Sequence, residues 1–284
     1  MKVCVIGSGG REHALAWRLS ISPSVTKVYA IPGSAAMSDC AELVGIDWQQ
    51  SDHLIRFLKD NHVDLVVVGP EAPLVAGLAD ALNAAGIPVF GPSKAAAQLE
   101  GSKVFAKDLM KKYNIPTAAY GVFHKVDEAK EFIGQTGAPI VVKADGLAAG
   151  KGVVVAMTVE EANAAVEDML SGNRFGDAGS TVVIEEFMEG EEASLLAFVD
   201  GKTVVPMIAS QDHKRIFDGD KGPNTGGMGT YAPAPVLTDA LRDEAMKTIL
   251  EPMVAAMEKE GMPYVGCLYA GLMITPQGPK VVEF

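Results

Sequence analysis

Strands and helices alternate along residues 2–90, and this alternation constrains the fold more than any other feature of the chain. Apolar runs of strand length occupy residues 2–6, 27–31, 64–68 and 88–90. Helical periodicity falls between them, at residues 11–19, 52–61 and 69–85. Alternation of this kind predicts an α/β fold with a doubly wound parallel sheet, in which ligands bind at the carboxyl ends of the strands.

The turn after the first predicted strand carries part of a nucleotide-binding pattern. It contains Gly7, Gly9, Gly10 and Arg11. A dinucleotide fingerprint would need a glycine where Glu12 stands and an acidic residue where the second strand ends in Pro32. NAD is therefore disfavoured, whereas a phosphate at the N-terminus of the following helix is consistent with the pattern. A solvated helix face would account for Arg11 equally well.

The third predicted strand ends in Gly69, Pro70 and Glu71, at the same edge of the sheet. Because ligands gather at this edge, these three residues are candidates for substrate binding. Turn formation alone would also explain a glycine followed by a proline.

A glycine-rich basic segment lies between two β-branched runs, at residues 139–144 and 153–157. Its glycines and charged residues are Lys143, Asp145, Gly146, Gly150, Lys151 and Gly152. Glycines let backbone N–H groups face an anion, and lysines supply positive charge. The segment is not a Walker A loop, because it lacks a Ser or Thr after the lysine and a strand follows it. It predicts either an ATP-binding loop on a β-hairpin or a solvated surface hairpin.

Carboxylates cluster where the strand predicted at residues 181–187 ends. Glu185 and Glu186 lie in the strand, and Glu191 and Glu192 follow it. Consecutive carboxylates repel one another, and a ligand hydroxyl or amine would relieve the repulsion. A solvated strand exit is the alternative and is commoner for acidic runs.

Three further segments contribute predictions. Ser102 is expected to cap a helix whose first turn holds Lys103, a position that the helix dipole disfavours unless an anion is nearby. Residues 211–229 lack apolar periodicity and are predicted to form a long functional loop. A long helix is expected to begin after Thr238 and to bend at Pro252, followed by two strands around a turn at residues 276–278.

Charge and cysteine usage exclude several classes of function. The formal net charge of -12 over 284 residues disfavours a nucleic-acid or anionic-membrane surface. The three cysteines are far apart and lack metal-ligand spacing. No apolar run approaches the ~20 residues of a membrane span, and the N-terminus has the pattern of a strand rather than a signal peptide. A cytoplasmic protein without nucleic-acid or membrane partners is expected.

In their order and spacing, these motifs resemble the glycinamide ribonucleotide synthetase (phosphoribosylamine–glycine ligase) family of the ATP-grasp superfamily. The matching segments are residues 5–14, 68–74, 99–103, 143–152, 184–187, 210–215 and 222–231. The resemblance implies an ATP-grasp fold with a Rossmann-like N-terminal domain. The implied parts are residues 1–100 for that domain, 101–118 for a helical connector, 119–190 for the lid subdomain and 191–284 for the core subdomain.

The resemblance also implies a reaction and its participants. Glycine is joined to 5-phosphoribosylamine in purine biosynthesis, with ATP as cosubstrate and ADP and phosphate as products. All partners are then small molecules, and the protein is a monomer or a weak homodimer.

Residue roles follow from the same resemblance. Lys103 and Lys143 are the catalytic residues that contact the ATP phosphates, and the loop from Asp145 to Gly152 closes over them. The adenine and ribose are assigned to Glu185, Glu186, Phe187, Met188, Glu191 and Glu192. The sugar phosphate is assigned to Gly7, Gly9, Gly10 and Arg11, and Gly69, Pro70 and Glu71 are assigned to substrate binding. The rest of the acceptor site is assigned to Asp212, Lys214, Pro223, Asn224, Thr225, Gly226 and Gly227.

The implied cofactor is Mg²⁺ or Mn²⁺, with Glu283 as its candidate ligand. The family pattern has a second acidic ligand on the preceding strand, where this chain has Gly271 or neutral neighbours. It also continues past Glu283 with an asparagine ligand, so the chain is expected to correspond to an N-terminal portion of such an enzyme. Another ATP-grasp carboxylate–amine ligase and a nucleotide-binding fragment without activity remain as alternatives.

Overall fold

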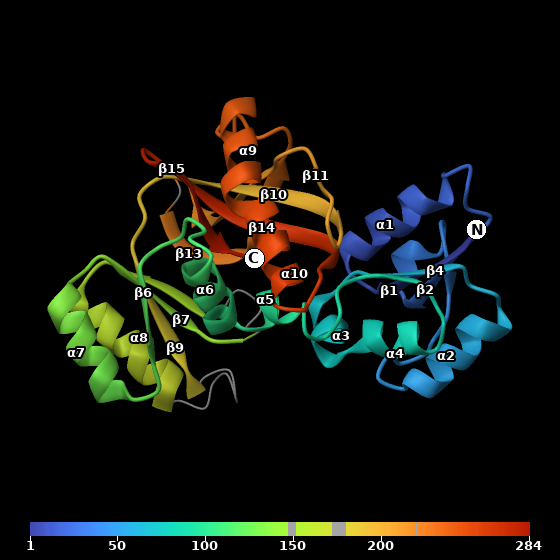
Figure 1. The fold of residues 1–284 in the computed structure, drawn as a ribbon, viewed down its shortest axis with the longest axis horizontal. Coiled ribbons are helices and arrows are strands. Elements are labelled where there is room, and N and C mark those ends of the chain that lie inside the picture. The colour runs from blue at the N-terminus through green and yellow to red at the C-terminus, as the bar shows by residue number, and fades with distance from the viewer. Residues whose placement is uncertain (147–151, 172–179, 220) are drawn as a thin grey trace. The chain divides into compact units, whose positions relative to one another are not determined.

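The computed structural model describes residues 1–146, 152–171, 180–219 and 221–284 (Figure 1). The chain divides into two compact units. The first comprises Met1–Gln98 and Met262–Cys267, and the second comprises Leu99–Gly261 and Leu268–Phe284. In the ranges just given, no helix is both long and apolar enough to cross a membrane.

A five-stranded parallel sheet forms the centre of the first unit, in the order β3-β2-β1-β4-β5. Its strands are β1 (Lys2–Gly7), β2 (Lys27–Pro32), β3 (Glu42–Leu43), β4 (Leu65–Val68) and β5 (Val89–Phe90). This sheet confirms the predicted doubly wound α/β arrangement. The prediction missed β3, whose two exposed residues are too few to show a periodic pattern.

Apolar clusters cover both faces of this sheet. Successive side chains of a strand point to opposite faces, so one strand can contribute to both clusters. On β1, Cys4 and Ile6 belong to one apolar cluster, which includes Leu54 of helix α2 (Ser51–Asp60). Val5 belongs to the other cluster, with Ala16 of helix α1 (Gly10–Ser20). Figure 1 shows α1 on one side of the sheet and α2 on the other. This two-sided burial explains why the strands are continuous apolar runs.

The single helix predicted at residues 69–85 is wrong, because the structure has two. Helix α3 (Glu71–Ala76) ends at Gly77, and helix α4 (Leu78–Ala84) begins after it. Gly77 has a φ of +98°, a left-handed conformation that favours glycine over residues with a Cβ. Apolar spacing continues across this break, so periodicity alone did not reveal it.

The second unit begins with short helices and an antiparallel sheet. Helices α5 (Gln98–Gly101) and α6 (Lys103–Lys112) precede the sheet, whose strand order is β6-β9-β7-β8. The strands are β6 (Tyr120–Phe123), β7 (Ile140–Ala144), β8 (Val153–Ala156) and β9 (Val182–Glu186). Helices α7 (Val126–Thr136) and α8 (Val159–Ser171) pack against it through an apolar cluster that includes Ile133, Val142 and Val166.

Strands β7 and β8 form the predicted hairpin, with Lys143 opposite Val153. The tip of this hairpin, which includes Gly150 and Lys151, lies outside the described residues. The predicted hairpin is confirmed, whereas closure of its loop over a nucleotide stays a prediction.

A second four-stranded sheet has the order β11-β10-β14-β15. Its strands are β10 (Glu191–Asp200), β11 (Val204–Pro206), β14 (Val265–Thr275) and β15 (Gly278–Glu283). The antiparallel pairing of β14 with β15 places Gly271 opposite Glu283. A neutral residue therefore faces Glu283 across the strands, as the sequence indicated.

The helix predicted after Thr238 is present in three segments. They are α9 (Asp239–Ala245), the π-helical segment η3 (Met246–Leu250) and α10 (Glu251–Lys259). Thr238 caps α9 as predicted, since its side chain accepts a hydrogen bond from the Leu241 N–H. The distortion expected at Pro252 lies in the turn before it: Pro252 is the second residue of α10 and follows the wider π turn.

The long loop predicted at residues 211–229 is wrong, because this segment forms an antiparallel hairpin. Strand β12 (Gln211–Phe217) pairs with β13 (Lys221–Tyr231), with register shifts on both sides of Arg215. These two strands form a separate sheet, and the described side chains from Asp212 to Phe217 are exposed or half-buried. Neither face covers a core, so the apolar alternation that identifies a strand is missing.

Candidate functional site

The first part of the site in the second unit lies at the N-terminus of α6. Ser102 caps this helix by accepting a hydrogen bond from the Phe105 N–H at 3.1 Å. The Asp145 carboxylate, just after β7, accepts from the Val104 N–H at 3.2 Å. Lys103 donates to the Gly146 carbonyl at 2.8 Å. The predicted residues Lys103, Asp145 and Gly146 therefore lie together, with a carboxylate at the positive end of the helix dipole.

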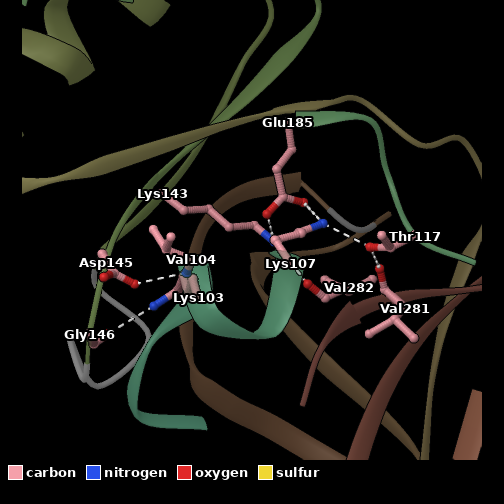
Figure 2. A network of polar contacts seen from close by, with 10 residues as sticks. All are labelled: Lys103, Val104, Lys107, Thr117, Lys143, Asp145, Gly146, Glu185, Val281 and Val282. Carbon is pink, nitrogen blue, oxygen red and sulfur yellow. Dashed lines mark hydrogen bonds and ion pairs between the residues drawn. The ribbon is translucent and has the colours of Figure 1, made fainter. Parts of the chain in front are cut away.

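A buried carboxylate lies between two buried lysines next to this helix end (Figure 2). Glu185 of β9 places Oε2 2.8 Å from Lys107 Nζ and Oε1 3.0 Å from Lys143 Nζ. All three side chains are at most 3% exposed as residues. Lys143 also donates to the Val282 carbonyl of β15 at 2.9 Å. We call Lys103, Lys107, Lys143, Asp145 and Glu185 the lysine–carboxylate network.

Burial governs the ionisation of Lys107 and Lys103. Burial lowers the pKa of Lys107 to about 8. The positive charge of Lys143 lowers this pKa further, and the attraction of Glu185 offsets only part of the decrease. Burial also lowers the pKa of Lys103, although Glu283 and Asp145 favour its charged form. The buried charged residues of the network are Lys107, Lys143 and Glu185. Two lysines and one glutamate leave an excess of positive charge.

A small pocket adjoins the network, and its lining includes Val282, whose carbonyl accepts the hydrogen bond from Lys143. Its polar and charged lining consists of Glu192, Ser194, Asp212, Lys214, Tyr269 and Glu283. Lys214 lies 3.3 Å from Glu192. Burial opposes the charged form of Lys214, but the nearby carboxylates of Glu192 and Glu283 help to raise its pKa. The structure thus brings together Glu192, Asp212, Lys214 and Glu283, which the sequence had selected from separate segments.

The remaining residues assigned to the adenine and ribose lie along the end of β9 and the start of β10. Glu186 is exposed and accepts a hydrogen bond from the Ala119 N–H at 3.3 Å. Phe187 and Met188 are half-buried, and Glu191 is exposed. Their contact with a nucleotide stays a prediction.

The hairpin β12–β13 carries the other residues assigned to the acceptor. Thr225 donates to the Lys214 carbonyl at 2.9 Å and accepts from the Gly227 N–H at 3.0 Å. A Cβ on Gly227 would lie 3.1 Å from Asp212 Oδ1. Pro223, Asn224 and Gly226 lie in β13. Thr225 thus links the backbone at Lys214 to that at Gly227, whereas substrate contact by the hairpin stays a prediction.

The glycine turn of the first unit surrounds a carboxylate. Glu12 is 5% exposed, and its Oε2 accepts a hydrogen bond from the Gly9 N–H at 2.7 Å. A Cβ on Gly7 or Gly69 would lie within 2.5 Å of Glu12 atoms. The absence of side chains at these positions therefore makes room for Glu12, and one amide that could face a phosphate is already used.

Arg11 lies beside this turn and connects it to the end of β4. Its guanidinium donates to the Gly69 carbonyl at 2.7 Å and to Glu71 at 3.0 Å. The structure thus brings Arg11, Gly69 and Glu71 together, as their positions after two neighbouring parallel strands predicted.

The residues present fit a divalent cation only in part. Within the described ranges, no group of three or more His, Cys, Asp or Glu side chains is arranged to hold a metal ion. Glu283 contributes a carboxylate at the pocket. Because magnesium is usually bound by one or two carboxylates together with substrate phosphates, Glu283 fits such a site as one ligand among several.

Sequence reasoning missed Lys107, Thr117, Tyr269 and the burial of Glu12. A signal was present for two of them. Lys107 lies one helical turn after Lys103, on the same face of the helix, and Glu12 occupies the position of the missing fingerprint glycine. Thr117 and Tyr269 lie in segments with no motif, so only the fold brings them to the site.

The fold and site together define an ATP-grasp protein. In the second unit, Lys143 of one four-stranded sheet donates to the Val282 carbonyl of the other, and a carboxylate-lined pocket lies beside this contact.

Comparisons with known proteins identify the family. Residues 1–100 match the family model "Phosphoribosylglycinamide synthetase, N domain", and residues 101–284 match "Phosphoribosylglycinamide synthetase, ATP-grasp (A) domain". The chain therefore belongs to the phosphoribosylglycinamide synthetase family.

Similar proteins agree with this assignment. A phosphoribosylamine–glycine ligase of Brucella melitensis is 59% identical, and one of Halalkalibacterium halodurans is 57% identical, each over 100% of this chain and 66% of the relative. A solved phosphoribosylamine–glycine ligase from Thermotoga maritima is 34% identical with a TM-score of 0.87, covering 100% of this chain and 68% of that one. The chain thus spans slightly less than two thirds of the length of the two curated relatives.

Proposed function

We propose that this chain binds ATP in its second unit and serves in a ligase that joins glycine to 5-phosphoribosylamine. The curated relatives carry the name of that activity, and their similarity covers the whole chain. The relatives are longer than this chain, so the proposal concerns the whole enzyme as well as the part described above.

The excess of buried positive charge is the observation that carries this proposal. Lys107 and Lys143 are buried with Glu185 as the one buried carboxylate of the network, and Lys103 is held nearby at the end of α6. Buried charges are normally paired, because leaving water is costly for an ion. An anionic ligand with several oxygens, such as the β- and γ-phosphates of ATP, would balance these lysines.

The chemistry of amide formation explains why such a ligase needs ATP. A carboxylate is a poor acyl donor, since its leaving group would be oxide. An oxygen of the glycine carboxylate attacks the γ-phosphorus, and the bond to ADP breaks. The amine of phosphoribosylamine then attacks the acyl carbon, loses a proton, and expels phosphate. The protein positions these groups and neutralises their charge, so no nucleophilic side chain is required.

The geometry supports a role for each residue in this proposal. Lys103 and Lys143 both belong to the lysine–carboxylate network and would contact the phosphates, and Glu192, which lines the adjoining pocket, would meet the ribose. Asp212 and Lys214 border the same pocket and would meet the amino acid or the amine. Arg11 is the cation of the first unit that would meet the sugar phosphate, with Glu71 its present partner.

A bound Mg²⁺ or Mn²⁺ would neutralise phosphate charge during the transfer. Glu283 is the side chain proposed to hold it, and its place in the lining of the pocket next to Val282 supports this assignment.

Calorimetric titration with ATP and an ADP-release assay test the proposal. The chain is expected to bind ATP, and Lys143→Ala is expected to weaken binding by about 1.5–3 kcal/mol, the range for a charge-assisted hydrogen bond. Arg11→Ala is the matched control: it removes a cation of the first unit, and ATP affinity is expected to stay unchanged.

ADP release is expected to require glycine together with freshly generated phosphoribosylamine. Equal ATP affinity in the chain with Lys143→Ala would contradict the phosphate assignment. Equal ADP release with glycine and with other amino acids would indicate a different carboxylate–amine ligase, and ATP binding without ADP release would indicate a chain that binds the nucleotide but does not catalyse.

A further inference from the structure

Lys107 contributes to the excess of buried positive charge, and its own contacts indicate a further role. It lies on α6, one helical turn after Lys103, and is 2% exposed. Its Nζ lies 2.8 Å from Glu185 Oε2 and donates a hydrogen bond to Thr117 Oγ1 at 2.8 Å (Figure 2). Burying a charged lysine destabilises the fold unless its partners are well placed, so the arrangement of Glu185 and Thr117 around Lys107 requires an explanation.

Two routes of contact lead from Glu185 to consecutive carbonyls of β15. In the first, Glu185 Oε1 meets Lys143, which donates to the Val282 carbonyl at 2.9 Å. In the second, Glu185 Oε2 meets Lys107, which donates to Thr117, and Thr117 donates to the Val281 carbonyl at 2.7 Å. Both routes end in the strand that carries Glu283.

The two oxygens of Glu185 differ in how well they are held. Oε2 lies against Lys107, whereas Oε1 is a buried oxygen with no hydrogen-bond partner of good geometry among the described residues. Its 3.0 Å contact with Lys143 is an ion pair. Lys143 is therefore held firmly by the Val282 carbonyl and only electrostatically by Glu185, which leaves its remaining N–H groups for a ligand.

We propose that Lys107 is a positioning residue of the nucleotide site: by holding Glu185 through Oε2 and β15 through Thr117, it sets the place from which Lys143 meets the phosphates. This inference rests on the proposed function. Lys107 itself is directed toward Glu185 and Thr117, and it acts on the ligand through them. Without it, Glu185 has Lys143 as its buried cationic partner and draws that lysine away from the ligand.

The test is calorimetric titration of the chain with ATP, with thermal unfolding measured on the same variants. Lys107→Met is expected to lower ATP affinity by about tenfold, the scale of coupling between contacting buried groups. Lys107→Arg keeps the charge and is expected to restore most of that loss. Lys111→Met is the matched control, since Lys111 is exposed on the same helix, and its ATP affinity is expected to equal that of the unmutated chain.

Two further variants separate positioning from a general effect on folding. Thr117→Val keeps the shape of the side chain but removes the hydroxyl between Lys107 and the Val281 carbonyl, and a smaller loss of ATP affinity is expected. Combining Lys107→Met with Glu185→Gln is expected to reduce affinity no more than Glu185→Gln does alone, because Lys107 acts through Glu185.

The outcomes are distinguishable. If the unmutated chain fails to bind ATP, the proposed function is wrong and this inference falls with it. If the unmutated chain binds ATP and the chain with Lys107→Met binds it equally well, with only its thermal stability reduced, Lys107 is structural and the inference alone is wrong. If Lys107→Met does not fold, unchanged ATP affinity in Thr117→Val overturns the inference.

Discussion

At the scale of single residues, the glycines of the first unit have two different roles. A Cβ on Gly69 would lie 2.3 Å from Glu12 Oε1, whereas a Cβ on Gly10 would meet nothing within 4 Å. Gly69→Ala is therefore expected to lower the free energy of unfolding by about 1–3 kcal/mol, the usual effect of overpacking a buried site. Gly10→Ala, in the first turn of α1, is expected to be neutral or stabilising by up to about 1 kcal/mol.

Urea denaturation of both variants checks this difference, with the two alanines serving as controls for each other. Equal stability of the two would mean that Glu12 moves aside easily and that its buried position does not depend on Gly69. The sequence predicted that these glycines lie together at one edge of the sheet. It did not predict their separate roles, because the burial of Glu12 depends on contacts across two strands.

At the scale of elements, the end of α6 couples stability to the site. Ser102 Oγ accepts from the Phe105 N–H and donates to Asp145 Oδ2 at 3.2 Å. Ser102→Ala is expected to lower the free energy of unfolding by about 1 kcal/mol through loss of the cap. It is also expected to weaken ATP binding, because Asp145 and Lys103 lose the contact that fixes the helix end beside them.

Thr238→Ala is the matched control for this prediction. Thr238 caps α9 in the same way, through the Leu241 N–H, and α9 contributes no residue to the lysine–carboxylate network as defined above. Its loss of stability is expected to be similar, and its ATP affinity unchanged. The measurements are chemical denaturation and calorimetric titration, and an equal fall of ATP affinity in both variants would show that the effect is a general one.

Elements were predictable where one of their faces covers a core. The continuous apolar run of β1 and the helical spacing of α7 and α8 follow from burial, and the sequence displays both. The hairpin β12–β13 and the break at Gly77 were not predictable in this way. The first has no buried face to impose a pattern, and the second depends on a single backbone conformation that leaves the apolar spacing intact.

At the scale of the whole molecule, the site is assembled from segments that are distant in sequence. Lys143 and the Val282 carbonyl, for example, are 139 positions apart. Motifs predicted which segments carry charged groups, and the family resemblance predicted that they meet. Neither predicted which oxygen of Glu185 faces which lysine, because that depends on the register of β9 against β7 and on the packing of α6.

Because this assembly buries Lys107, the free energy of unfolding is expected to depend on pH in the alkaline range. Burial lowers the pKa of Lys107 from 10.5 in the unfolded chain to about 8 in the folded one. Between these values the unfolded chain binds more protons, so the contribution of Lys107 to stability rises with pH, by at most about 1.4 kcal/mol per pH unit. Below pH 8 both states are protonated, and the folded state retains a buried charge.

Tyrosines act in the opposite direction, since burial raises the pKa of Tyr269 and the folded chain then holds its phenolic proton more tightly. The comparison of the unmutated chain with Lys107→Met removes this background. Urea denaturation at constant ionic strength from pH 7 to 10 is expected to show the unmutated chain gaining stability relative to Lys107→Met as pH rises above 8. Parallel stability curves for the unmutated chain and Lys107→Met would mean that Lys107 keeps an ordinary pKa, and that its contacts with Glu185 and Thr117 fully compensate for its burial.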